Sequence, residues 1–357
     1  MSDNLEYLYK SFGYLRFGIF PLVIWYLIEN KKNFLRDLFY IFLFCFFILS
    51  LDAAREFFSG INILGHQKLT YRVSSFFGDE LILGSYLSRL LPIFLALLLM
   101  FHDKLKIFQK YKTFKISGLI LISSFAIIVS GERIAIFFLF SLVILSFFLL
   151  DFQIKYKLIC LSFFIFASLF VVNTSHTLKT RIIDSTKAQI GLKNELLLSY
   201  GIKKNNNTKY IFSEVHQSHF ETAYNMFRIH PFLGVGPKNY RNFCMRDHIY
   251  VNKYSCVTHP HNTLIQLMAE TGILGALFII TLNIFIYYIC IKDFFLKFFK
   301  KKKLLSNFDV LLIISIINSI FLFIPSGSFF NNFLSIIYYF PIGIILWSFN
   351  KKSIIKF

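Results

Sequence analysis

Charged residues are scarce in this chain of 357 residues, since Asp, Glu, Lys and Arg make up 16% of it, against roughly 25% in an ordinary soluble domain. Five cysteines are too few for a small scaffold built on disulfides. In place of charge, the chain is 56% hydrophobic and contains 48 Phe residues. This composition excludes a simple soluble globule and a disordered chain, and it indicates a polytopic membrane protein.

A helix needs about 20 apolar residues to cross the hydrocarbon core of a membrane. Nine stretches approach or exceed this length: about 12–28, 34–51, 80–101, 114–130, 132–150, 156–173, 262–291, 307–325 and 330–349. Backbone polar groups inside lipid must be satisfied within the segment, so we expect helices. The predicted fold class is an all-α polytopic membrane protein with about nine transmembrane helices and one large external loop between the sixth and seventh.

Acidic residues are the scarcer charges, with 19 Asp and Glu against 38 Lys and Arg and a net charge of +19. In a soluble protein this surplus would indicate nucleic-acid binding. Here the basic residues gather in every second short connection and in the tail: Lys31, Lys32 and Arg36; Lys104, Lys106, Lys110, Lys112 and Lys115; Lys155 and Lys157; Lys292, Lys297, Lys300, Lys301, Lys302 and Lys303; Lys351, Lys352 and Lys356. The positive-inside rule places these on the cytoplasmic face. We therefore expect no nucleic-acid partner, and an amino terminus on the outer face without a recognisable signal peptide.

The segment 174–260 differs from the other connections, because its 87 residues are too many for an idle loop. It holds 12 Lys or Arg, 5 Asp or Glu and six of the nine His residues. Long loops cross the membrane largely regardless of charge, so an external position is compatible with this surplus. We predict three parts: membrane helices in 1–173, a periplasmic loop domain in 174–260 and membrane helices in 261–357.

Within this loop, residues 203–209 are polar and predict a flexible tip. The following run FSEVHQSHFETAYNMFRIH predicts an amphipathic helix that ends before Pro231. Its expected apolar face consists of Phe220, Ala223, Tyr224 and Phe227.

His261 and Asn262 stand where the external loop meets a predicted span, and nine residues separate Asn262 from Gly272. A neutral imidazole at this place can take a proton from an acceptor hydroxyl or hold it. Glu270, in the same predicted helix, is a candidate buried hydrogen-bonding partner. The alternative is that His259 and His261 are interfacial residues that cap a helix. A metal site on His259 and His261 is disfavoured, because no carboxylate or cysteine cluster completes it.

Arg133 lies between two apolar runs in the sequence Ser130-Gly131-Glu132-Arg133. An ionisable residue at membrane depth is a functional hypothesis by default, and Arg is well suited to phosphate. The alternatives are an Arg that reaches to the interface or a local pair with Glu132.

Lys238 and Arg241 follow a glycine-rich turn, which can offer backbone N–H groups and cations to an anion. An ordinary solvated loop is the alternative. Cys244 and Cys256 lie in the same loop, where an oxidising compartment permits a disulfide; two free thiols are the alternative. The polar residues Ser326, Ser328, Asn331 and Asn332 either line an external cavity or form a tight helical hairpin.

These residues together resemble the O-antigen ligase and O-antigen polymerase family of bacterial envelope proteins. His261-Asn262 with Gly272 is similar to that family's motif after its large periplasmic loop, and HPFLGVGPKNY at residues 230–240 is similar to its His-Pro segment. Further similar stretches are SGERIA at 130–135, GSFFNN at 327–332 and FGDELILGSYLSRLLP at 77–92. The resemblance covers most of the chain from about residue 70.

The resemblance implies a metal-independent, inverting glycosyltransferase with no cofactor, in the bacterial inner membrane, with its active site facing the periplasm. The donor would be a glycan on undecaprenyl diphosphate. The acceptor would be lipid A-core in a ligase or another lipid-linked glycan in a polymerase, and membrane lipids would surround both. His261 and Arg133 match two of the family's important positions and are the predicted catalytic residues.

The chain departs from the family pattern at two places. The family's second Arg, before its His-Pro segment, is absent, and His216 and His219 stand in that region. We predict that Lys238 or Arg241 supplies the missing cation, and that His216, His219, His259 and Asn262 also contact substrate. Family members often have more spans and an internal amino terminus, so we expect an odd number of leading helices to be missing.

The predicted function is O-antigen ligase-like transfer to lipid A-core, with polymerisation of lipid-linked repeat units as the alternative. A flippase or transporter of a polar lipid is a rival from another class. It is disfavoured because most charges lie at span ends and no repeats are visible. A structural membrane subunit is a third possibility.

Overall fold

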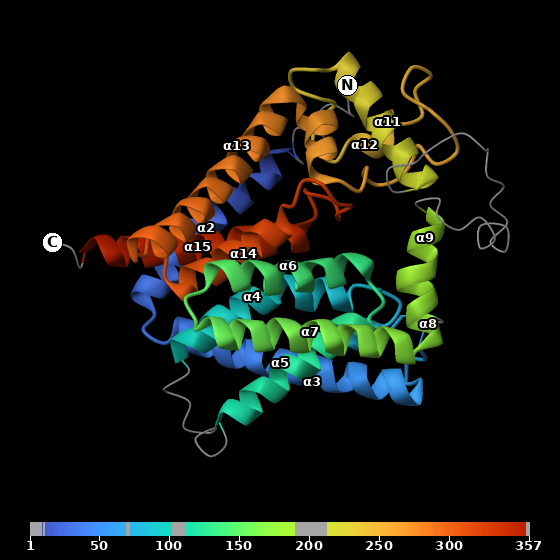
Figure 1. Ribbon diagram of the computed structural model, residues 1–357. Coiled ribbons are helices and arrows are strands. Elements are labelled where there is room, and N and C mark those ends of the chain that lie inside the picture. Colours follow the sequence, from blue (N-terminus) through green and yellow to red (C-terminus); the bar gives the residue numbers. More distant parts are fainter. Residues whose placement is uncertain (1–8, 10, 69–71, 102–111, 190–212, 355–357) are drawn as a thin grey trace. The chain divides into compact units, whose positions relative to one another are not determined.

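The computed structural model describes residues 9, 11–68, 72–101, 112–189 and 213–354. These residues form helices joined by turns and loops (Figure 1). In this part of the chain no strand occurs, and the one extended pairing is an isolated bridge between Ile61 and Gln67. The all-α fold class is therefore confirmed. Residues 203–209 and the amino-terminal residues lie outside the described part.

The principal helices are α2 (Arg16–Asn30), α3 (Phe34–Ser59), α4 (Leu83–Phe101), α5 (Lys112–Val129), α6 (Arg133–Leu149), α7 (Ile154–Thr174), α11 (Glu214–Ile229), α13 (Thr263–Lys300), α14 (Asn307–Ser319) and α15 (Asn332–Ile354). Shorter elements are η1 (Ser75–Phe77), α8 (His176–Lys179), η4 (Thr180–Asp184), α9 (Ser185–Gln189) and α12 (Tyr240–Phe243).

Within the described residues, six helices are long and apolar enough to cross a membrane: Ser11–Asn30, Phe34–Ser59, Leu83–Phe101, Ile154–Thr174, Thr263–Lys300 and Asn332–Lys351. Three more apolar helices are shorter, at Lys115–Val129, Arg133–Leu149 and Asn307–Ser319. The chain is thus a multi-pass membrane protein. Each predicted stretch coincides with an apolar helix, but the count of nine spans stays a prediction.

Contacts between residues divide the chain into two compact units. The first consists of Met1–Tyr26, Lys187–Ile291 and Ser319–Leu346, and the second of Leu27–Thr186, Lys292–Asn318 and Trp347–Phe357. The predicted division into 1–173, 174–260 and 261–357 stays a prediction.

In the second unit, α3 packs on α4 and α5, α4 on α5 and α6, and α7 on α5 and α6 (Figure 1). The abundant Phe residues fill the contact between α3 and α4. Phe39 and Phe46 stack on Phe94, with ring centroids 6.1 and 4.8 Å apart, and all three side chains are fully buried. Aromatic rings in such arrangements add to the free energy gained from burial alone.

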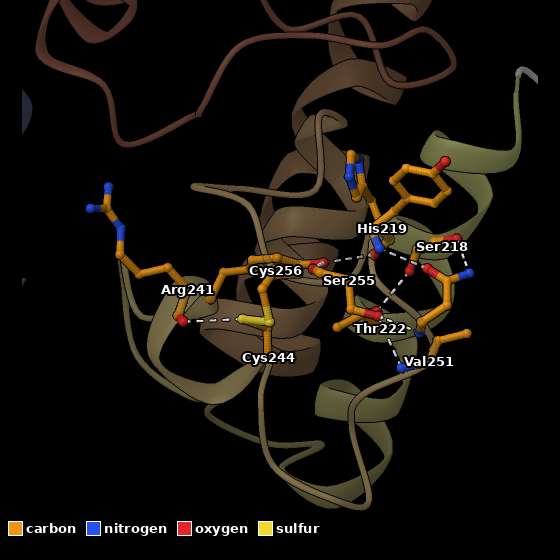
Figure 2. The surroundings of a disulfide bond; sticks show 11 residues. Ser218, His219, Thr222, Arg241, Cys244, Val251, Ser255 and Cys256 are labelled. Atoms are coloured by element: carbon orange, nitrogen blue, oxygen red, sulfur yellow. Dashed lines mark hydrogen bonds between the residues drawn. A yellow bond between two sulfur atoms is a disulfide. The ribbon is translucent and has the colours of Figure 1, made fainter. Parts of the chain in front are cut away.

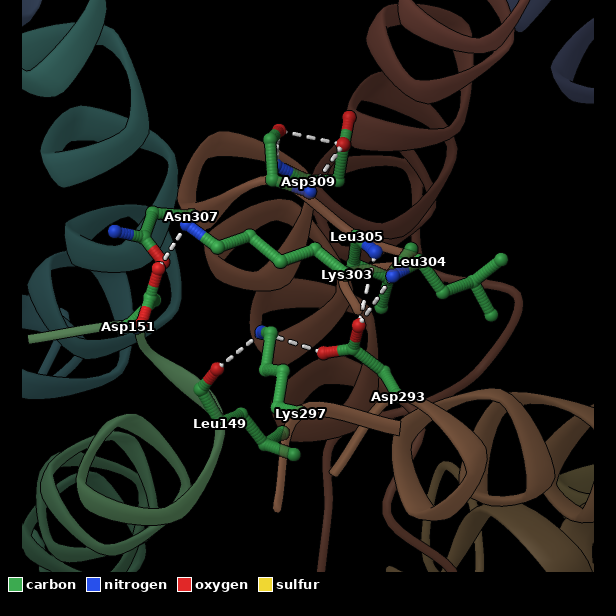
Figure 3. A network of polar contacts seen from close by, with 10 residues as sticks. Leu149, Asp151, Asp293, Lys297, Lys303, Leu304, Leu305, Asn307 and Asp309 are labelled. Atoms are coloured by element: carbon green, nitrogen blue, oxygen red, sulfur yellow. Dashed lines mark hydrogen bonds and ion pairs between the residues drawn. The ribbon is translucent and has the colours of Figure 1, made fainter. Parts of the chain in front are cut away.

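The polar contacts around α13 and α14 also belong to the second unit (Figure 3). The Lys297 ammonium donates to the carbonyl of Leu149, at the end of α6, and pairs with Asp293 at 2.5 Å. Asp293 accepts the backbone N–H groups of Leu304 and Leu305, each at 2.9 Å. The predicted basic connection 292–303 is largely helical, because α13 extends to Lys300, and these contacts hold the charge of Lys297.

In the first unit, the predicted loop helix is α11. It begins at Ser213, whose side chain accepts the backbone N–H of His216. The predicted apolar face is wrong in part: Ala223 is fully buried, but Tyr224 is 54% exposed. The buried face also carries Ser218, whose hydroxyl accepts from Asn252 at 2.7 Å. Polar contacts with the loop therefore accompany the apolar packing of Ala223 and Met226 on this face.

Candidate functional site

The two family-like motifs of the first unit meet at a break in α13. Gly272 has φ 66° and ψ −157°, a conformation essentially confined to glycine. The N–H groups of Val235 and Gly236 donate to the carbonyls of Ala269 and Glu270, both at 2.9 Å. The N–H of Ile273 donates to the carbonyl of Pro231 at 2.7 Å. The loop backbone thus satisfies polar groups that the break removes from the helix.

This pairing requires glycine on both sides. A Cβ atom on Gly272 would collide with the carbonyl of Phe232. One on Gly234 would lie 2.5 Å from the amide nitrogen of Thr271. The spacing between the His-Pro segment and the later glycine is therefore explained by direct contact of two backbones.

Glu270 is fully buried and confirms the predicted hydrogen-bonding role. One carboxylate oxygen accepts the N–H of Tyr240 at 2.9 Å, and the other accepts from Gln266 at 2.8 Å. The backbone N–H groups of Lys238 and Asn239 face the same carboxylate. The anion that the glycine-rich turn binds is therefore the carboxylate of Glu270, a residue of the chain itself. The Lys238 side chain stays exposed, and its backbone has φ 60°.

Asn262 is the N-cap of α13. Its side-chain oxygen accepts the N–H of Ile265, and its amide donates to the carbonyls of Leu322 and Ile324. Next to it, His261 has φ 56°, and its carbonyl accepts the N–H of Ser326 at 2.7 Å. The predicted last external turn is thus tied to the start of α13, which fixes the backbone that carries the His261 ring.

Three imidazole rings gather around that of His261. Ring centroids lie 4.2 Å away for His259, 5.4 Å for His219 and 5.9 Å for His216. His216 and His219 come from α11, where their spacing of three residues places them on one side of the helix. The structure therefore brings together four of the predicted site residues from two separate motifs.

Burial favours the neutral form of His219, His259 and His261. It lowers the pKa of His261 below its usual 6.5, and a protonated His261 would disfavour protonation of the neighbouring rings. Burial first and His261 second lower the pKa of His219 to about 4 and that of His259 to about 3. The backbone near Tyr254 and Ser326 opposes these shifts only in part.

A disulfide between Cys244 and Cys256 braces the chain before His259, which confirms the prediction (Figure 2). Ser255 lies between the two cysteines in sequence. The hydroxyl of Tyr240 donates to the carbonyl of Ser255 and also to that of His219. Figure 2 shows the Arg241 side chain extending away from the disulfide. Its charge reaches the cluster, because it contributes to the lowered pKa of His259.

Arg133 belongs to the second unit and begins α6. Its guanidinium donates to the hydroxyl of Thr186 at 3.2 Å. The neighbouring Glu132 accepts the N–H of Gly84 at 2.9 Å and the hydroxyl of Ser85 at 2.7 Å, and pairs with Arg72 at 3.4 Å. Glu132 thus joins the start of α4 to the start of α6 beside Arg133.

Comparison with protein families decides the classification. A family model described as O-Antigen ligase matches residues 118–280, a region that includes both Arg133 and His261. This match supports the O-antigen ligase and polymerase family for the chain. No curated protein matches it.

The similarity to the O-antigen ligase family implies a membrane enzyme of the general glycosyltransferase type, with lipid-linked glycans as substrates. Among the described residues of this ligase-family chain, no group of three or more His, Cys, Asp or Glu side chains is placed to hold a metal ion.

The sequence interpretation did not single out three arginines of the second unit: Arg72, which pairs with Glu132, and Arg89 and Arg181, whose charges lie near Glu132 and Arg133 respectively. Arg89 offered a signal, because an Arg inside an apolar run is costly in a membrane. Arg72 and Arg181 offered none, since they stand in polar segments of ordinary composition.

Proposed function

We propose that the protein transfers a glycan from undecaprenyl diphosphate to a hydroxyl of lipid A-core, at the periplasmic face of the inner membrane. The observation that carries this proposal is His261, a neutral imidazole on a fixed backbone at the start of α13. An imidazole that stays neutral near pH 7 is suited to accept the proton of an attacking hydroxyl.

The chemistry is a direct displacement at the anomeric carbon. The acceptor oxygen forms the new bond as its proton passes to His261, while the bond from the anomeric carbon to the phosphate oxygen breaks. Its electron pair leaves with the diphosphate, so the configuration inverts and no metal is required. Arg133 stabilises the charge that develops on the leaving group.

The other predicted contacts divide by exposure. Arg241 is exposed and His216 is half-buried, which suits both to touch substrate directly. Lys238 is exposed as well and remains a candidate cation. His219, at 2% exposure, and Asn262, at 4%, are suited to holding the site in shape.

The test uses the purified protein in proteoliposomes with a lipid-linked glycan donor and lipid A-core. We expect His261→Ala and Arg133→Ala each to lower the transfer rate at least 100-fold while membrane insertion stays unchanged. His248→Ala is the matched control, because this exposed histidine of the same loop lies outside the cluster. Full activity of either site variant would refute the assignment.

Polymerisation of lipid-linked units is the alternative, because the family match covers both activities. Deleting the gene and separating the envelope glycans on a gel distinguishes them. Loss of all long chains from lipid A-core indicates a ligase, whereas chains with one repeat unit indicate a polymerase. Lipid transport without bond formation in the proteoliposomes would favour the flippase instead.

A further inference from the structure

The exposed apolar surface of α13 begins immediately after the break at Gly272. From Thr263 to Gly272 no residue of this helix is exposed. Beyond the break, large apolar side chains are exposed at helical spacing: Leu274, Leu277, Phe278, Ile284, Phe285, Tyr288 and Ile291. A continuous apolar stripe on a helix of this length is the surface that lipid covers in a membrane protein.

The length of α13 places the edge of the hydrocarbon at the same level. The helix has 38 residues, which is about 57 Å and nearly twice the hydrocarbon thickness. Between Glu270 and Lys292 lie 21 uncharged residues, 271–291. These residues are enough for one crossing. The crossing therefore needs only the part of α13 that follows Gly272.

Two residues of the loop add apolar surface at this level. Phe232 is 74% exposed and Leu233 is 72% exposed. Their backbone touches the break, because a Cβ atom on Gly272 would lie 2.3 Å from the carbonyl oxygen of Phe232 and 2.7 Å from the amide nitrogen of Leu233. The exposed pair therefore adjoins the start of the stripe at Leu274.

Helix α11 connects this pair to the histidine cluster. Near its start, the ring of His219 lies 5.4 Å from that of His261. The helix ends at Ile229, which is 47% exposed, and the carbonyl of Pro231 then accepts the N–H of Ile273 at 2.7 Å. Thus α11 begins beside the start of α13 and ends beside its break.

The charges around the exposed pair have one sign. No acidic residue occurs in the segment 222–246. Arg228 is exposed at the end of α11. The guanidinium of Arg246, which is also exposed, lies 3.7 Å from the centre of the Phe243 ring, and that ring lies 6.1 Å from the ring of His230. Two cations therefore flank the turn, as is usual for segments that lie on an anionic lipid surface.

We propose that residues 229–233 form a membrane anchor, in which Phe232 and Leu233 enter lipid at the edge of the hydrocarbon and Arg228 and Arg246 contact lipid phosphate groups. Lipid removes from water two large apolar side chains that the protein leaves uncovered. The stripe of α13 and the exposed pair then form one continuous lipid-facing surface. The inference does not rest on the proposed function.

The anchor sets the height of the histidine cluster above the membrane. Thr263 and Gly272 are nine residues apart, which is about 14 Å along a helix. Because the turn pairs with the break, its insertion in lipid keeps the start of α13 within this distance of the hydrocarbon. His261 is then held where a substrate with its lipid tail in the membrane can reach it.

Tryptophan fluorescence of the full chain in proteoliposomes tests the anchor. Trp25→Phe and Trp347→Phe remove both native tryptophans, and either Phe232→Trp or Leu233→Trp is then added. We expect phospholipids with brominated acyl chains to quench the emission of each variant by about half or more, because each side chain lies in lipid. Iodide in the water should quench each variant at least about threefold less than the control.

The matched control is Lys253→Trp in the same background. Lys253 is exposed and follows Asn252, which bonds to Ser218 in the first half of α11. We expect iodide, and not the brominated lipid, to quench this tryptophan. Unchanged elution in size-exclusion chromatography shows which variants fold, and either folded site variant is sufficient for the comparison.

Iodide quenching of a site variant equal to that of Lys253→Trp would overturn the proposal. Protection from both quenchers would overturn it as well, because protein and not lipid would then cover the turn. The result is separate from glycan transfer. Quenching by brominated lipid in a protein that transfers no glycan would leave the anchor standing and refute the proposed function, whereas transfer without such quenching would refute the anchor alone.

Discussion

Three imidazole nitrogens near His261 are buried without a hydrogen-bond partner among the described residues: both of His219 and Nε2 of His259. An imidazolium at either position would lose hydration with no carboxylate to replace it, so the neutral form is favoured. The side chain of His261 is more exposed than that of His219, which is 2% exposed. The neutral rings of His219 and His259 thus lie beside His261, the histidine that is suited to exchange a proton.

The pH dependence of transfer follows from this arrangement. The pKa of His261 is lowered below 6.5, so the neutral base predominates at pH 7 and is lost only as the pH falls through the lowered value. We expect a rate that is flat above pH 6.5 and falls about tenfold per pH unit on the acid side. His219→Ala should admit water and move this acid limb to higher pH, as a single-turnover pH profile would show.

His248→Ala is the control for this profile, because its side chain is exposed and outside the cluster. An acid limb centred at pH 6.5 or above in the unaltered protein would contradict the expectation. So would an unchanged limb in His219→Ala, because burial is the largest cause of the lowered pKa.

At the scale of residues, sequence reasoning identified His261, Glu270 and the cysteine pair from their spacing and residue type. It could not predict which group accepts hydrogen bonds from the backbone N–H groups of the glycine-rich turn. A turn of this kind binds an anion in many proteins, and only the fold shows that Glu270 lies there. Arg72 was missed for the same reason, because its pairing with Glu132 is a tertiary contact.

At the scale of elements, the break in α13 decides how the loop is held. The helix would continue through Gly272 on periodicity alone, and an apolar stretch of this length predicts an unbroken span. Instead, the carbonyls of Ala269 and Glu270 accept from Val235 and Gly236. The sequence predicted both motifs, but hydrophobic periodicity contains no information on pairing between two backbones that lie 30 or more residues apart.

Gly272→Ala tests this pairing. The conformation at Gly272 is essentially restricted to glycine, and the added Cβ would collide with Phe232. We expect a loss of stability of about 3 kcal/mol or more, together with loss of transfer activity. Thermal unfolding in detergent, followed by intrinsic fluorescence, measures the first effect.

Gly118→Ala provides the matched control, because Gly118 lies within α5 and no atom lies within 4 Å of a Cβ built there. This variant should unfold at or slightly above the temperature of the unaltered protein, since Ala favours a helix over Gly by about 1 kcal/mol. If both substitutions have the same effect, the backbone contact does not hold the loop.

At the scale of the whole molecule, the net charge of +19 divides into topological and chemical parts. Many of the cations lie in short segments between apolar helices, where the positive-inside rule accounts for them. Composition was sufficient to predict an all-α membrane protein, because lipid permits few other structures. The number of crossings could not be predicted as firmly, since Lys115–Val129, Arg133–Leu149 and Asn307–Ser319 are shorter than a span requires.

The predicted orientation can be tested by cysteine labelling in intact cells. In a background with Cys45, Cys160 and Cys290 replaced by Ser, single cysteines replace Lys253 and Lys301, both of which are exposed. If the segment 174–260 is external, Lys253→Cys reacts with a membrane-impermeant maleimide in intact cells. Lys301→Cys, in the basic segment after α13, reacts only after permeabilisation. The background without added cysteines controls for reaction at Cys244 and Cys256, which the disulfide protects. The reverse pattern would place the His261 cluster on the cytoplasmic side, where a reducing environment opposes the disulfide, and would refute transfer at the periplasmic face.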